Sequence, residues 1–129
     1  MLEQRIQQHF IDSADLKYQA AQALSAPIAA AVQAILACVT SGGKVLACGN
    51  GPSAAEALQF AAFCVAGFER DRPELAALAL TSDSTLLTVA GGGSDVAQQF
   101  ARQVRALGQA GDVLLALSVT GNDANVIAA

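Results

Sequence analysis

Three short runs of this chain are almost entirely apolar, and this feature limits the fold more than any other. Polar loops and helical segments separate the runs, which cover residues 44–48, 75–80 and 113–118. Strands that are apolar throughout are typical of parallel sheets covered by helices on both faces. The sequence therefore predicts an α/β fold with a parallel sheet built on these three strands.

Helical segments lie before, between and after the predicted strands. Residues 2–24 contain no glycine or proline and predict one long helix, and Pro27 predicts the first turn of a second helix over 27–39. Further helices are predicted over 53–66, from residue 81 towards the glycines 91–93, over 94–107, and from about residue 123. The result is a single domain, residues 1–129, with N-terminal helices in 1–40 and a βαβαβ core in 41–129.

The second predicted helix is apolar on almost every side, which predicts burial on every side. In a chain of 129 residues, we expect partner subunits to cover part of it. A three-stranded sheet is also thin, so the protein either oligomerises extensively or is part of a longer chain. We favour the longer chain, because the sequence stops within its last predicted helix.

Composition narrows the possible classes of function. Hydrophobic residues make up 53% of the chain and charged residues 14%, which argues against disorder, and the net charge of −4 argues against direct nucleic-acid binding. No apolar run approaches about 20 residues, so we expect no membrane span. The three cysteines lack metal-ligand spacing, and the N-terminus lacks a signal-peptide pattern. We expect a cytoplasmic protein with reduced thiols and neither a metal nor a cofactor.

Two of the predicted strands end in loops rich in Gly, Ser, Thr and Asn, at residues 49–53 and 118–122. Ligands of parallel sheets bind at the carboxyl ends of strands, and helix N-termini favour anions. The loops therefore suggest a cradle for a phosphorylated small molecule, although such residues also occur wherever a strand turns into a helix. A loose dinucleotide fingerprint at Gly49, Gly51 and Ala54 lacks the acidic residue after the next strand, which argues against nicotinamide chemistry.

Residues 42–55 (GGKVLACGNGPSAA) resemble the first phosphate loop of the sugar isomerase (SIS) domain family, and within it the phosphoheptose isomerase group. Residues 71–73, 79–83 and 111–122 match in the same order. The resemblance implies a three-layer α-β-α, flavodoxin-like fold, a homotetramer packed through the N-terminal helices, and about 60 further residues after Ala129. It also implies sugar-phosphate binding at Asn50, Gly51, Ser53, Asp83, Ser118, Thr120 and Asp123.

Two kinds of protein in this group share these motifs. The sedoheptulose 7-phosphate isomerases use a Glu base and a His on the helix after the first loop, where this chain has Phe63 and Gln59. Their Asn-Asp pair after the second strand corresponds here to Gly92-Gly93. The DnaA initiator-associating proteins lack the Glu, and residues 68–73 and 102–112 resemble those proteins more closely.

We therefore expect a non-catalytic adaptor for the replication initiator DnaA, with no catalytic residue of its own. An active sedoheptulose 7-phosphate isomerase is the alternative, and a sugar-phosphate-sensing regulator is a third reading. Among single residues, His9 is expected to be a surface or interface residue rather than a catalyst. Glu56 could be a base, but a solvated helix position or a cap is favoured, and Asp83 either lines the site or caps the next helix. Asp123 is expected to cap its own helix and to repel a phosphate.

Overall fold

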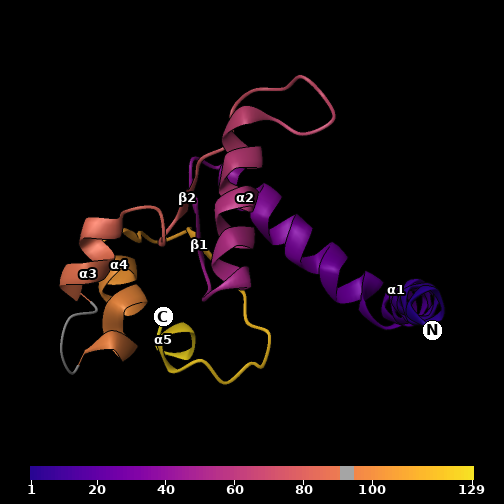
Figure 1. The fold of residues 1–129 in the computed structure, drawn as a ribbon. Helices are drawn as coiled ribbons and strands as arrows, with labels where there is room; N and C mark the ends of the chain where they lie inside the picture. Colours follow the sequence, from indigo (N-terminus) through magenta and orange to yellow (C-terminus); the bar gives the residue numbers. More distant parts are fainter. Residues whose placement is uncertain (91–94) are drawn as a thin grey trace. The chain divides into compact units, whose positions relative to one another are not determined.

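The computed structural model describes residues 1–90 and 95–129. Its elements are α1 (Leu2–Thr40), β1 (Val45–Cys48), α2 (Pro52–Ala66), β2 (Ala77–Ala79), α3 (Ser84–Ala90), the 3₁₀ helix η1 (Val96–Gln98), α4 (Gln99–Leu107), β3 (Val113–Ala116) and α5 (Ala124–Ile127) (Figure 1). Met1–Ala34 and Ile35–Ala129 form two compact units, which are described separately below.

The second unit holds a parallel sheet with the strand order β2-β1-β3. Val45 of β1 is in register with Ala77 of β2 on one side and with Val113 of β3 on the other. The predicted α/β class and parallel sheet are confirmed, and each strand is shorter than its apolar run. Because β1 is central, all four of its residues are buried.

Side chains of β1 alternate between two small cores, one on each face of the sheet. On one face Leu46 and Cys48 pack with Leu80, Phe100 and Val126. On the other face Ala47 packs with Ala57, Ala61 and Ala79, where small residues let α2 lie close to the sheet. Helices therefore cover both faces of the sheet, as the three-layer prediction requires. Cys38, Cys48 and Cys64 are buried free thiols, as expected.

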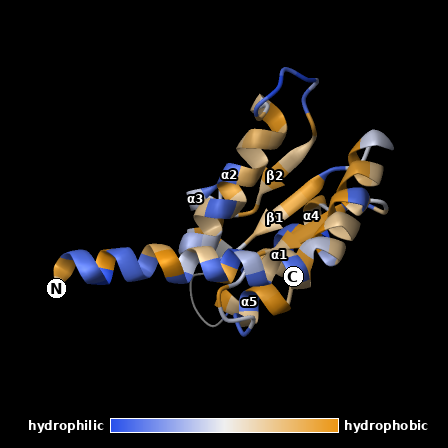
Figure 2. Cartoon of the chain, turned by 90° about the vertical axis from the view of Figure 1, so that its right-hand side faces the viewer, coloured by the Kyte–Doolittle hydropathy of each residue, from blue (hydrophilic) through white to orange (hydrophobic). Residues whose placement is uncertain are grey.

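The prediction of two N-terminal helices is wrong, because α1 continues through residues 25–27 with Pro27 inside it. Proline removes one backbone hydrogen bond, but the alanine-rich sequence on both sides strongly favours helix. The segment 27–39 was also predicted to be buried on every side. In this chain by itself it is not, because Cys38 is the one residue of α1 that the structure describes as buried. Figure 2 shows hydrophilic and hydrophobic residues alternating along the N-terminal part of α1.

Helix α1 is also long and apolar enough to cross a membrane by length and composition, contrary to the expectation from its apolar runs. Core helices of soluble proteins and signal sequences near an N-terminus share this length and composition. The predicted helix over 94–107 is divided between η1 and α4, and it ends at Gly108 as expected. Ser94, Gly92 and Gly93 lie outside the described residues.

Candidate functional site

The loop after β1 meets the first turn of α5, which follows the β3 loop, through a reciprocal pair of side-chain amides. Asn50 donates from Nδ2 to Oδ1 of Asn125 over 2.8 Å, and Asn125 donates from Nδ2 to Oδ1 of Asn50 over 2.8 Å. The two residues are 75 positions apart in the sequence. Parallel strands bring their carboxyl ends to one edge of the sheet, so β1 and β3 place these loops side by side. The predicted meeting of the two loops is thus what the structure shows.

Asp123 joins this pair and is held by two side-chain donors. Asn50 Nδ2 lies 3.2 Å from Oδ1 of Asp123, and the Ser118 hydroxyl donates to Oδ2. These hydrogen bonds, that from Ser118 first, lower the pKa of Asp123 below its ordinary value. The carboxylate is therefore ionised at neutral pH. The expectation that it caps its own helix is wrong, because its side chain makes no cap hydrogen bond with α5.

The hydroxyl groups of the β3 loop are engaged within the loop itself. Gly121 donates its backbone N–H to Ser118 Oγ over 2.8 Å, and Asn122 donates its own to Thr120 Oγ1 over 3.2 Å. Since the Ser118 hydroxyl donates to Asp123, that carboxylate takes a hydrogen bond that a bound anion could otherwise accept. Thr120 is exposed at the surface of the loop.

The β1 loop forms a tight start to α2. Gly51, the residue before the helix, has a φ of 53°, a left-handed conformation that glycine adopts without strain. The N–H groups of Ser53 and Ala54 donate to Asn50 and Gly51 carbonyls, each over 3.0 Å. A Cβ atom on Gly49 would lie 2.7 Å from the Ser53 backbone, so the loop requires glycine there. Ser53 is buried beneath the loop and does not line the cavity described next.

An open cavity of about 480 Å³ lies beside the amide pair. It is lined by Asn50, Val96, Ala97, Gln99, Asp123, Ala124 and Asn125. Sequence reasoning missed the three residues of η1 and α4, because no local pattern indicates that this segment returns to the sheet edge. Asp123 is the one charged side chain among these described lining residues, which makes this wall of the site negative.

Asp83 serves the structure of α3. Its Oδ1 accepts the backbone N–H of Leu86 over 3.0 Å, which decides the open alternative in favour of the cap. Asp83 does not join the Asn50–Asp123 cluster. Thr81, two residues after the end of β2, has a buried hydroxyl without a hydrogen-bond partner among the described residues. Its place after a strand was a signal that sequence reasoning did not use.

The two positions that correspond to the family's catalytic pair lie on α2. Gln59 is exposed, and Phe63, 40% exposed, packs against Phe68 with 4.9 Å between ring centroids. Neither side chain exchanges protons near neutral pH. Glu56 is exposed on the same helix, three residues before Gln59 and seven before Phe63. These spacings place all three side chains on one face of α2.

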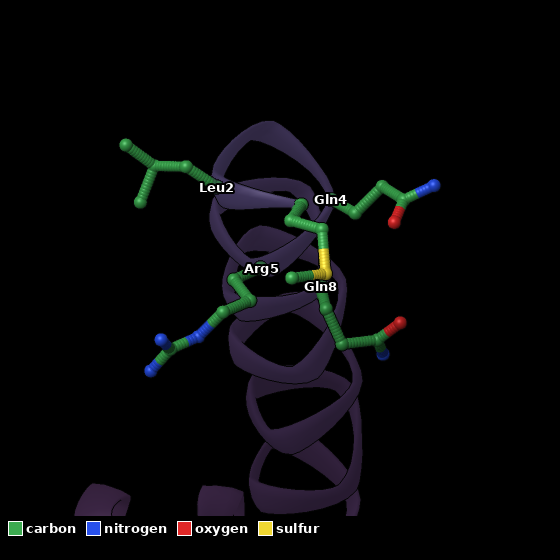
Figure 3. Close-up of a pocket in the computed structure, with 5 residues that line it drawn as sticks. Leu2, Gln4, Arg5 and Gln8 are labelled. Atoms are coloured by element: carbon green, nitrogen blue, oxygen red, sulfur yellow. The ribbon is translucent and has the colours of Figure 1, made fainter.

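A second hollow of about 480 Å³ lies at the N-terminal end of α1 and has no features of a site. Figure 3 shows Leu2, Arg5 and Gln8 projecting away from one another around a single helix. His9 is exposed on the same helix, as expected. Among the described residues, no group of three or more His, Cys, Asp or Glu side chains could hold a metal ion.

Comparisons with known proteins find the same family along nearly the whole chain. The family described as "SIS domain" matches residues 8–129. A phosphoheptose isomerase from Methylibium petroleiphilum is 62% identical over 129 residues, which are 100% of this chain and 64% of that protein. A second, from Aromatoleum aromaticum, is 54% identical over 97% of this chain and 63% of its own length. The chain thus spans a little under two thirds of these relatives.

Solved structures agree with the sequence relatives. The phosphoheptose isomerase GmhA from Neisseria gonorrhoeae superposes with a TM-score of 0.92 and 44% identity, over 99% of this chain and 66% of that one. A phosphoheptose isomerase from Francisella tularensis gives a TM-score of 0.93 and 38% identity, over 99% and 67%. The resemblance to the phosphoheptose isomerase group is therefore confirmed.

Proposed function

We propose, starting from the fact that the chain belongs to the SIS domain family, that the protein binds a sugar phosphate and isomerises sedoheptulose 7-phosphate. The observation that carries this proposal is the 62% identity with a phosphoheptose isomerase over all 129 residues. The relatives' names favour this reading over the DnaA-associating one, which was our first expectation. A cytoplasmic location belongs to the same proposal.

The reaction moves a carbonyl group between C2 and C1 of the sugar, so it needs a group that accepts and returns a proton. Phe63 and Gln59 cannot supply it. Glu56 is the carboxylate on that face of α2, one turn nearer to the β1 loop than Gln59. We therefore assign the role of base to Glu56 in the proposed reaction.

The test is turnover of sedoheptulose 7-phosphate by the purified chain and by the Glu56→Gln variant. We expect the variant to lose at least about a hundredfold in kcat, the usual contribution of general-base catalysis. Glu74→Gln, on an exposed loop before β2, is the matched control and should keep the activity of the unmodified chain. Turnover unaffected by Glu56→Gln would contradict the assignment of the base, and no turnover at all would contradict the isomerase.

A second candidate is supported by Phe63 itself. With an exposed phenylalanine in place of a base, this position of α2 cannot transfer a proton and presents an apolar surface instead. An exposed apolar surface is typical of a binding protein. In that case the protein is a non-catalytic adaptor, with the DnaA initiator as the partner implied by residues 68–73 and 102–112, or a regulator that senses a sugar phosphate. Absence of turnover together with capture of purified DnaA would support the adaptor, and sugar-phosphate binding without capture would support the regulator.

A further inference from the structure

We propose that Asn125, a largely buried residue of the cavity wall, is a positioning residue that locks Asn50, and through it Asp123, at the edge of the cavity. The inference rests on the proposed function, because the cavity is the place where that function would hold a sugar phosphate. It also reassigns Asn50, for which the sequence predicted direct sugar-phosphate binding.

The hydrogen-bonding capacity of the two amides supports this assignment. An amide nitrogen carries two hydrogens, and Asn50 uses both of its own, one for Asn125 and one for Asp123. Asn50 therefore has no free amide hydrogen for a phosphate. Asn125 is 92% buried, since only 8% of its surface is exposed, and its oxygen accepts from both Asn50 and the Val126 backbone N–H.

Which way each amide of the pair is turned is determined by two further hydrogen bonds, one to Asp123 and one from the Val126 backbone N–H. Turning one amide over would set oxygen against oxygen and nitrogen against nitrogen within the pair. Turning both together would preserve the pair but set Asn50 Oδ1 against the Asp123 carboxylate and Asn125 Nδ2 against the Val126 N–H. Val126 is itself buried in the core beside Leu46 and Phe100, so the core determines which atoms Asn50 directs to Asp123.

The Asn125→Asp variant removes the one donor that faces Asn50 while keeping the size of the side chain. A carboxylate oxygen would then face Asn50 Oδ1 with no hydrogen between them, which drives the Asn50 amide away from its place. We expect the pKa of Asp123, followed by NMR of its carboxyl carbon, to rise because its Asn50 donor is displaced. Because the displaced Asn50 no longer holds the β1 loop against the residues that follow β3, the cradle loses its shape, and we expect affinity for sedoheptulose 7-phosphate, measured by calorimetry, to fall by about tenfold.

Asn122→Asp is the matched control. Asn122 lies in the same loop, is exposed, and uses its backbone N–H rather than its side chain in the hydrogen bond with Thr120. The control adds the same charge without touching the amide pair. We expect it to leave the pKa of Asp123 nearly unchanged and to alter affinity less than Asn125→Asp does. Equal effects of the two variants would overturn the proposal, since charge alone would then explain them.

A measurement on the unmodified chain guards against a variant that fails to fold. If the pair is locked, the side-chain amide hydrogens of Asn50 and Asn125 exchange with solvent at least about tenfold more slowly than those of Asn122. Equal exchange rates would overturn the proposal. If the unmodified chain does not bind sedoheptulose 7-phosphate, the proposed function fails, whereas the exchange rates and the pKa of Asp123 still decide the role of Asn125.

Discussion

At the scale of single residues, the charge of Asp123 determines how strongly this site binds an anion. Its carboxylate is ionised, and it accepts hydrogen bonds from the Ser118 hydroxyl and from one amide hydrogen of Asn50. The Asp123→Ser variant should therefore raise the affinity for a sugar phosphate, by about fivefold, because a like charge close to the phosphate is removed. The gain should be largest at low ionic strength, where charges are screened least.

Calorimetric titration with sedoheptulose 7-phosphate at two salt concentrations measures this effect. Asp71→Ser, on an exposed loop, changes the net charge of the chain equally and should leave the affinity unchanged. Strong binding by the unmodified chain that does not increase in Asp123→Ser would show that the carboxylate does not limit access.

At the scale of elements, the Asp112 carboxylate, directly before β3, holds the start of β1 through hydrogen bonds from Lys44. Asp112 accepts hydrogen bonds from the backbone N–H groups of Lys44 and Gln109 and from Nζ of Lys44, the last over 2.6 Å. The Lys44 contacts first, and then Gln109, lower the pKa of Asp112 from 3.8 to about 2. A lowered pKa in the folded state adds stability that is present above pH 3.8 and is lost as the pH falls through about 2.

The Asp112→Asn variant should therefore lose less stability than the unmodified chain when the pH falls from 4 to 2, a range set by these two pKa values. Thermal melting followed by circular dichroism across that range measures the difference. Asp71→Asn removes an exposed carboxylate elsewhere and should follow the unmodified chain. Parallel pH profiles for the unmodified chain and Asp112→Asn would contradict this linkage.

At the scale of the whole molecule, the open question is what covers α1. Leu24, Ile28 and Val32 lie four residues apart, on one face of this helix, and are 48%, 57% and 57% exposed. An exposed apolar face of this kind is typical of an interface between subunits. We therefore keep the homotetramer as a prediction, and light scattering should give about four times the chain mass of 13.0 kDa.

The Ile28→Glu variant should lower that mass, because a charge would be buried in the interface without a partner. Gln33→Glu adds the same charge next to this face rather than within it, and should leave the mass unchanged. A mass of one chain for the unmodified protein would exclude the tetramer. A membrane-associated protein would instead partition into detergent micelles, which the same measurement detects.

The sequence alone determined the strands, their parallel arrangement and the family, because apolar runs and glycine loops are local signals that the fold leaves unchanged. It did not determine the continuity of α1, since Pro27 is compatible with both a helix start and a helix interior. Nor did it determine the site as it is built. Local patterns do not indicate a role for Asn125, and they predict a helix cap at Asp123, because the partner of both residues, Asn50, is more than 70 residues away. Hydrogen bonds over such separations exist only once β1 and β3 lie side by side, so the tertiary structure alone decides them.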